Sequence, residues 1–197
     1  MTFKLGLTGS IGMGKSTTAQ MFVDLGCALW DADAAVHRLY AKGGAAVAPM
    51  SKAFPDAIEN GAVSRDRLKE MISKDPSVLK QTETIVHPLV AADRMAFLEG
   101  STADISVLDI PLLYETGADV TMDAVVVVSV NIDEQKRRLM QRARMTVDQI
   151  ETIMNMQAPD AEKRAKADYV VETDTLEHAR AQVQSVVQNI RTRLANA

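Results

Sequence analysis

The sequence predicts an α/β fold, a parallel five-stranded sheet with helices on both faces, which makes three layers. Short apolar runs rich in β-branched residues alternate with helical patterns, as in proteins whose parallel strands are joined by helical crossovers. Residues 124–128 are apolar at every position, which is typical of a central strand buried on both faces. The chain has 197 residues, 47% of them hydrophobic, so we expect one domain over residues 1–197 that contains insertions.

Five short runs are the expected strands, and they cover residues 3–8, 27–31, 105–110, 124–130 and 169–172. Helical patterns cover residues 16–25, 133–142, 147–157 and 176–194. A further helical block over about 34–98 has expected breaks at Gly43-Gly44, Asn60-Gly61 and Pro88. That block is too long for a simple crossover, so we expect an inserted helical subdomain over about 34–100. A second insertion of two short helices, over about 133–166, precedes the last strand.

Local signals predict several helix ends. Asp75 is a candidate N-cap, and Pro76 follows it at the first helical position, where a missing N–H costs nothing. Thr146 and Gln149 have the spacing of a capping box. Gly100 is well placed to end the preceding helix.

Composition and charge exclude several classes of protein. The net charge is −4 with both signs interspersed, which argues against a binder of nucleic acids or of anionic membranes. The longest apolar runs are too short to cross a bilayer, and Lys4 interrupts the first strand, so we expect neither a membrane span nor a signal peptide. Cys27 is the single cysteine, interpreted as a core residue rather than a reactive thiol, and we expect a cytoplasmic protein. The histidines lack metal-ligand spacing, so a zinc site is not expected.

The segment GSIGMGKS, residues 9–16, matches the pattern G-x-x-x-x-G-K-[ST] and lies between an expected strand and an expected helix. We call this segment the phosphate loop. Its glycines allow consecutive backbone N–H groups to approach phosphate oxygens, and the following helix adds the positive end of its dipole. Lys15 supplies a cation for the terminal phosphates, and the Ser16 hydroxyl can ligate Mg²⁺. A glycine-rich turn is the alternative, but a turn requires neither a lysine nor a serine there.

Carboxylates follow two of the expected strands. Asp109 ends the apolar run 105–109 and resembles the aspartate that helps to hold Mg²⁺ in nucleotide-binding proteins, although a helix cap or turn is the alternative. Asp31 and Asp33 end the second strand, at the edge of the sheet where ligands gather. We expect one of these two to be catalytic. The other reading is a cap for the next helix, and the spacing alone does not choose between them.

A cluster of cations follows the fourth strand: Lys136, Arg137, Arg138, Arg142 and Arg144. Arg138 and Arg142 share one helix face because they are four residues apart. They are interpreted either as a solvated face paired with Asp133 and Glu134, or as a lid whose arginines neutralise a transferring phosphate. The phosphate loop favours the lid.

The segments LTGSIGMGKST, DADAAVHRLY, IVHPLV, LDIPLLYETG and ADYVV occur in this order, and through them the chain resembles the dephospho-coenzyme A kinase family over nearly its whole length. The resemblance implies a P-loop kinase core with a helical substrate-binding insertion and a helical lid. It also implies ATP-dependent phosphorylation of the ribose 3′-hydroxyl of dephospho-CoA, the last step of coenzyme A synthesis, with ATP and Mg²⁺ as cofactors.

The resemblance also assigns roles to residues. Asp33 matches the catalytic base and Arg142 the lid arginine, and Lys15 assists them by offsetting charge on the transferred group. The residues matching the ATP loop are Gly9, Ser10, Ile11, Gly12, Met13, Gly14, Lys15, Ser16 and Thr17. Those matching the acceptor side, besides Asp33, are Arg65, His87, Pro88, Asp109, Leu112, Leu113 and Glu115. Ser16 and Asp109 are the expected Mg²⁺ ligands.

The chain departs from the family pattern at two places. Thr173-Asp174-Thr175 stand where the family often has Asn-x-Gly, so no residue is assigned to the base of the nucleotide. Ala143 and Arg144 replace an acidic-glycine pair in the lid. The rival functions are another small-molecule kinase of the nucleoside or nucleotide monophosphate type, a nucleotide switch, and a phosphate-binding module without catalysis. Guanine-specific switches usually carry N-K-x-D, which does not occur here.

Overall fold

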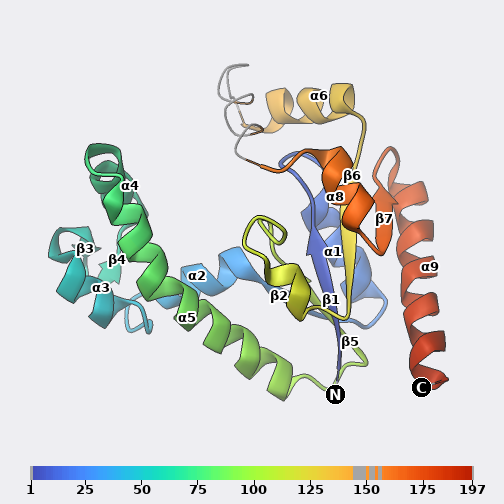
Figure 1. The fold of residues 1–197 in the computed structure, drawn as a ribbon, viewed down its shortest axis with the longest axis horizontal. Helices are drawn as coiled ribbons and strands as arrows, with labels where there is room; N and C mark the ends of the chain where they lie inside the picture. The colour runs from blue at the N-terminus through green and yellow to red at the C-terminus, as the bar shows by residue number, and fades with distance from the viewer. Residues whose placement is uncertain (1, 144–149, 151–153, 155–156, 197) are drawn as a thin grey trace. The chain divides into compact units, whose positions relative to one another are not determined.

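The computed structural model describes residues 2–143, 150, 154 and 157–196. Its main sheet has the strand order β2-β5-β1-β6-β7 (Figure 1). The strands are β1 (Phe3–Thr8), β2 (Ala28–Asp31), β5 (Ile105–Asp109), β6 (Ala124–Ser129) and β7 (Tyr169–Glu172). β1 pairs in parallel with both β5 and β6, and β6 pairs in parallel with β7. The expected α/β class and five-stranded sheet are confirmed.

The chain divides into two compact units, Met1–Trp30 with Ser101–Ala197, and Asp31–Gly100. Among the described residues, the helices of the first unit are α1 (Lys15–Asp24), η2 (Ala118–Thr121), α6 (Ile132–Ala143), α8 (Asp160–Lys166) and α9 (Leu176–Ala195). The seven-residue α8 was not expected, because among its side chains only that of Lys163 is buried and apolar periodicity is missing. The expected helix over 147–157 and the capping box of Thr146 and Gln149 lie largely outside the described residues.

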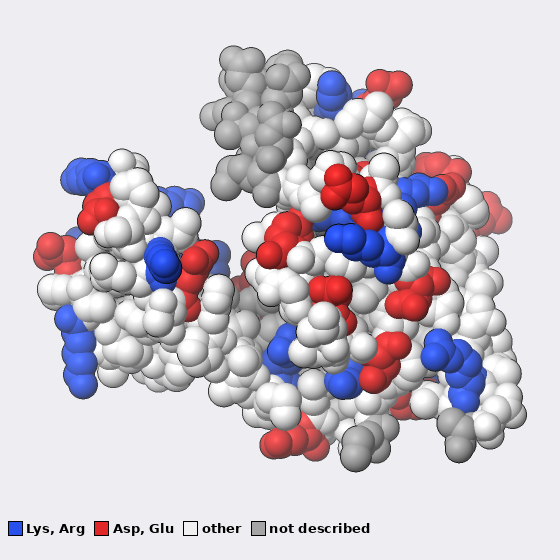
Figure 2. Space-filling model, in the orientation of Figure 1, with Lys and Arg blue, Asp and Glu red and all other residues white. Residues whose placement is uncertain are grey.

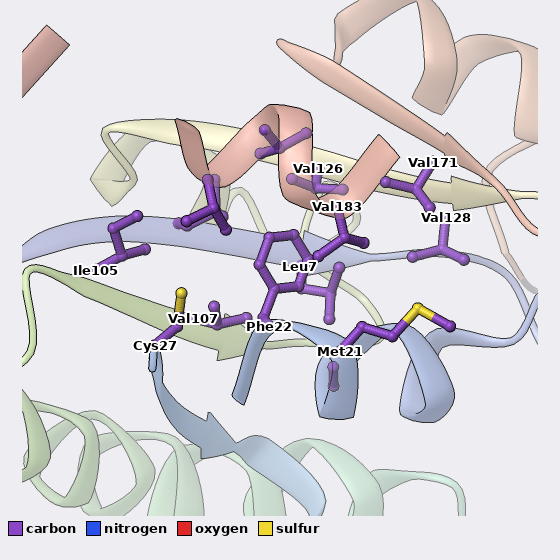
Figure 3. Close-up of a cluster of buried hydrophobic side chains, with 14 of the residues drawn as sticks. Leu7, Met21, Phe22, Cys27, Ile105, Val107, Val126, Val128, Val171 and Val183 are labelled. Carbon is purple, nitrogen blue, oxygen red and sulfur yellow. The ribbon is translucent and has the colours of Figure 1, made fainter. Parts of the chain in front are cut away.

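The core of the first unit forms on both faces of the sheet because β6 is apolar from Ala124 to Val128. Val126 and Val128 point into a cluster with residues of α1 and α9, among them Phe22 (Figure 3). Val125 and Val127 point to the opposite face and pack with Leu113. Alternate residues of one strand therefore fill two layers of core, which explains the continuous valine run.

The second unit is mostly helical and contains a short hairpin that the sequence did not predict. Its elements are α2 (Ala32–Tyr40), α3 (Val47–Ala53), η1 (Pro55–Ala57), β3 (Ile58–Glu59), β4 (Ala62–Val63), α4 (Arg65–Lys74) and α5 (Ser77–Gly100). β3 and β4 are antiparallel, and Asn60 and Gly61 between them have φ of 52° and 80°. A two-residue turn with positive φ at both positions suits a hairpin, so the expected break at Asn60-Gly61 is a strand reversal.

The expected break at Pro88 is wrong, because α5 continues through this residue to Gly100. Val78, Thr82 and Val86 are buried along one side of α5, whereas Pro88 and Thr84, four residues before it, are exposed. The carbonyl that loses its helical partner at Pro88 therefore lies where water can reach it, so the helix continues at reduced cost.

The C-terminal end of α5 agrees with the sequence, and its start agrees in part. Asp75 accepts a hydrogen bond from the Ser77 backbone N–H at 2.9 Å, as expected of a residue that caps the helix start. However, α5 begins at Ser77, so Pro76 precedes the helix and is not its first residue. Gly100 is the last residue of α5.

Surface charges are mixed. Figure 2 shows acidic and basic side chains interspersed over the visible face. No helix among the described residues combines the length and apolar character needed to span a bilayer.

Candidate active site

The phosphate loop requires glycine at three places. A Cβ atom added to Gly9 would lie 2.6 Å from the carbonyl oxygen of Val128, so only glycine lets the loop leave β1 beside β6. Gly12 and Gly14 have φ of 81° and 93°, values that L side chains rarely adopt. α1 begins directly after Gly14, so the loop ends at the positive end of a ten-residue helix. This geometry is suited to holding an anion.

An ion pair joins the phosphate loop to β5. The Lys15 ammonium donates to the Asp109 carboxylate, and the two side chains are only 17% and 3% exposed. The pairing of β1 with β5 explains the proximity, because Leu7 lies opposite Asp109 just before the loop begins. The cation and the carboxylate that the sequence singled out separately are therefore neighbours.

Thr173 holds the phosphate loop to α6, and sequence reasoning missed it. Its hydroxyl donates to the Met13 carbonyl at 2.7 Å and accepts from Arg138 Nη1 at 3.0 Å. Arg138 also donates to the Thr173 carbonyl. Thr173 stands at a position where the sequence departs from the family, and its partners are more than 30 residues away. No local signal reveals them.

The contacts of Arg138 support both interpretations of the basic cluster, the solvated helix face and the lid. Its Nε donates to Glu134 at 2.7 Å, and the same carboxylate pairs with Arg137. These pairs are the ones expected of a solvated helix face. The guanidinium of Arg138 nevertheless reaches Thr173 beside the phosphate loop, so it also belongs to the site. The hydrogen bonds that Arg137 and Arg138 donate to the Glu134 carboxylate lower the pKa of Glu134 to about 2.

A cavity of about 340 Å³ adjoins the phosphate loop. Residues from α1, α6 and the start of α9 line it, namely Gly12, Gly14, Thr17, Thr18, Met21, Glu134, Arg137, Arg138, Thr173, Asp174, Thr175, Leu176 and Ala179. A second cavity of about 450 Å³ lies where β6 and β7 end, and Met13 is the phosphate-loop residue in its lining. The first cavity is lined by two glycines of the loop, Gly12 and Gly14, so it suits a molecule that also contacts the phosphate loop.

Asp31 and Asp33 differ in their local roles. Asp31 is the N-cap of α2, and its carboxylate accepts the Ala34 backbone N–H at 2.8 Å. Asp33 is the second residue of α2, and its side chain is exposed. Asp31 thus serves as the cap, which favours Asp33 as the chemically available carboxylate of the pair.

Two residues expected on the acceptor side have structural partners. Leu113 is fully buried in the core with Val125 and Val127. Glu115 accepts the Ala158 backbone N–H and pairs with the Lys163 ammonium, both at 2.9 Å. Burial raises the pKa of Glu115, but the bonds from Lys163 and Ala158 outweigh it and leave the pKa lowered.

Apart from the buried Asp109, the other acceptor-side residues are more accessible. Leu112 is 42% exposed, and His87 is exposed on α5. Arg65, also exposed, begins α4 with its guanidinium 5.9 Å from the ring centroid of Tyr40. Arg142 belongs to α6, but its side chain is outside the described part of the chain, as is Arg144.

The donor set fits Mg²⁺ better than a transition metal. Ser16 is exposed in the first turn of α1, and its hydroxyl and the Asp109 carboxylate are hard oxygen donors. Among the described residues, no three histidine, cysteine or acidic side chains are grouped as metal ligands. Mg²⁺ usually takes one or two protein oxygens and fills its remaining positions with water and phosphate, so a sparse site suits it.

A family model and several relatives identify one family for this chain. A family model described as dephospho-CoA kinase matches residues 3–178. The dephospho-CoA kinase of Ruegeria pomeroyi is 65% identical over 191 residues, with 97% of each chain covered. That of Jannaschia sp. is 54% identical over 191 residues, covering 96% of this chain and 98% of the relative. The solved structure of a dephospho-CoA kinase from Campylobacter jejuni superposes with a TM-score of 0.72 at 25% identity, covering 96% of this chain and 98% of that one.

Proposed function

Because the chain belongs to the dephospho-CoA kinase family, we propose that its phosphate loop, Lys15 and Asp33 transfer the γ-phosphate of ATP to the ribose 3′-hydroxyl of dephospho-CoA. The fold is that of a P-loop kinase, and the activity is the final step of coenzyme A synthesis. The observation that carries the residue assignment is the glycine-built loop whose Lys15 is already paired with Asp109.

The triphosphate lies along the phosphate loop in this proposal. Backbone N–H groups and the start of α1 bind phosphate oxygens, and Lys15 exchanges Asp109 for the terminal phosphates. Ser16, directly, and Asp109, directly or through water, would hold Mg²⁺. When bound, Mg²⁺ neutralises charge on the phosphate oxygens. Gly9 to Thr17 then form the ATP-binding segment.

The 340 Å³ cavity beside the loop is the proposed pocket for the nucleoside part of ATP. Its walls combine the apolar side chains of Met21 and Leu176 with the guanidinium of Arg138. An aromatic base favours such a combination, because its faces are apolar and attract cations. Leu176 is 68% exposed, so this surface is open to a ligand.

Asp33 is the proposed base that accepts the proton of the 3′-hydroxyl as the oxygen attacks phosphorus. Arg142 is proposed to offset charge on the transferred group from a lid over about 133–166. Arg65, His87, Pro88 and Leu112 are proposed to contact dephospho-CoA from the insertion and from the segment after β5. For Leu113 and Glu115, the structure favours support of that segment over direct contact.

The cellular location and the partners of the protein are also proposals. Burial raises the pKa of Cys27 to about 11, as suits a cysteine in the core. We propose a cytoplasmic location because a single cysteine leaves no disulfide within the chain. We propose no nucleic-acid or membrane partner because charges of both signs are interspersed.

A coupled assay for ADP release tests the function. ATP turnover should depend on dephospho-CoA, and coenzyme A should accumulate in equal amount. Nucleosides and nucleoside monophosphates, supplied at the same concentration, should give no release above the rate without acceptor. Preferential phosphorylation of one of these would instead identify the rival small-molecule kinase.

A further inference from the structure

Two glutamines bind the backbone of the same residue of the phosphate loop, one at its carbonyl and the other at its N–H. Gln135 of α6 donates its side-chain N–H to the Ile11 carbonyl at 2.7 Å. Gln157 accepts the Ile11 backbone N–H on its Oε1 at 3.0 Å. The two side chains are 22 residues apart in sequence, and together they bind both polar groups of one residue. We call this arrangement the glutamine clamp.

The clamp acts next to a glycine of the phosphate loop. Ile11 directly precedes Gly12, which has a φ of 81° and, without a Cβ, has many alternative conformations in the unliganded loop. Gln135 is only 1% exposed, and its Cγ lies 3.4 Å from the position that a Cβ of Gly12 would occupy. Its side chain thus fills the space beside this glycine while its amide binds the preceding carbonyl. The loop conformation is fixed from outside.

We propose that Gln135 and Gln157 are positioning residues for ATP, which act by fixing the Ile11 peptide groups before the nucleotide binds. Neither side chain needs to touch ATP. A loop held in its binding conformation avoids part of the ordering cost that a free glycine-rich loop meets on binding. The proposal rests on the assignment of the phosphate loop to ATP.

The direction of the two hydrogen bonds gives a sharp test. Gln135→Glu removes the donor and places a carboxylate against the Ile11 carbonyl, whereas Gln157→Glu keeps an acceptor for the Ile11 N–H. Both variants add one negative charge near the same residue, so a repulsion of ATP by charge alone would affect them similarly. Gln157→Leu removes the acceptor without adding charge. Gln188→Glu adds the charge at an exposed position of α9, away from both cavities, and serves as the control.

We expect Gln135→Glu and Gln157→Leu each to raise the KM for ATP about three- to tenfold, the range that corresponds to one net hydrogen bond. The increase for Gln157→Glu should be smaller than for either of these. The KM for dephospho-CoA should be unchanged and kcat should fall less than twofold, because the chemistry is untouched. Direct titration of each full-length variant with ATP should show the same order of affinities.

Three results would overturn the clamp. These are an unchanged KM for ATP in Gln135→Glu and Gln157→Leu, an equal increase in the two glutamate variants, or a lower melting temperature with wild-type kinetic constants. If Gln135→Glu does not fold, Gln135→Met removes the same donor without a charge and carries the same expectation. The loop assignment is tested separately by Lys15→Ala. If Lys15→Ala weakens ATP binding but the glutamine variants do not, only the clamp fails.

Discussion

The Lys15 ammonium is bound to the Asp109 carboxylate, and each side chain is largely shielded from water. The pair connects the phosphate loop after β1 with the end of β5, so two neighbouring parallel strands deliver opposite charges to one point. A buried carboxylate without a counter-charge is costly, and Lys15 removes that cost while no nucleotide is bound. The same lysine is thus both a structural partner and a candidate phosphate ligand.

Lys15→Ala should lower turnover about 100-fold or more and weaken ATP binding, because the cation that neutralises the terminal phosphates is lost. It should also lower the free energy of unfolding, since Asp109 stays buried without its partner. Steady-state kinetics, titration with ATP and urea denaturation measure the three effects. Lys4→Ala removes a half-exposed lysine of β1 that pairs with Asp123 on the surface, and is the matched control. Full activity of Lys15→Ala would rule out our use of the loop.

Asp33→Asn should reduce kcat about 100-fold or more with little change in ATP affinity, because an amide cannot accept the proton of the attacking hydroxyl. Asp31→Asn is the paired control. Asparagine caps helices about as well as aspartate, so α2 should keep its start and the enzyme most of its activity. Near-normal turnover in Asp33→Asn, or an equal loss in both variants, would contradict the assignment of the base.

The strands of the sheet were predictable because each one is indicated by a short, continuous stretch of sequence. A buried parallel strand is a continuous apolar run, and the expected β1 and β7 have the observed bounds. The phosphate loop was predictable for a similar reason, since its glycines and Lys15 are fixed by spacing along the chain. The break expected at Pro88 was wrong because the sequence does not reveal that this side of α5 faces water.

Contacts between distant segments were not predictable. The choice between Asp31 and Asp33 depended on a cap that forms only once β2 ends and α2 begins. Thr173 and Gln157 are ordinary loop residues in the sequence, and their importance comes from bonds to Met13 and Ile11. Such contacts follow from the fold, and no periodicity or motif encodes them.

Glu115→Gln should destabilise the protein by about 3 kcal/mol or more, because it leaves the ammonium of Lys163 without a counter-charge and that side chain is completely buried. Lys163→Met should cost less, since Glu115 is 20% exposed and still accepts the Ala158 N–H. The double variant should be more stable than the sum of the two losses predicts. Urea denaturation at pH 7 measures all three. Additive losses, or an unchanged stability of Glu115→Gln, would show that the pair contributes nothing.

Asp104 and Arg191 should make stability depend on pH. The hydrogen bond from Arg191, assisted by its charge and by the Ile105 N–H, holds the pKa of Asp104 below its usual value despite some desolvation. A lowered pKa in the folded state means that the stabilisation is complete above the unfolded-state value of about 3.9 and disappears as the pH falls through the folded value. Because the Asp104 side chain is 42% exposed, solvent screening limits the contribution to about 0.5–1 kcal/mol.

Asp104→Asn should therefore lower the free energy of unfolding by about that amount at pH 7, and by progressively less below pH ~4. Arg191→Met should cost more at every pH, because Arg191 also donates to the Leu25 carbonyl at 3.1 Å and so joins α9 to the end of α1. Urea denaturation of each variant and the wild type from pH 7 to pH 3 gives the differences. Asp24→Asn removes another exposed carboxylate, which accepts a hydrogen bond from Gln20, and is the matched control. A constant difference between Asp104→Asn and the wild type across this range would mean that the ion pair does not cause the effect.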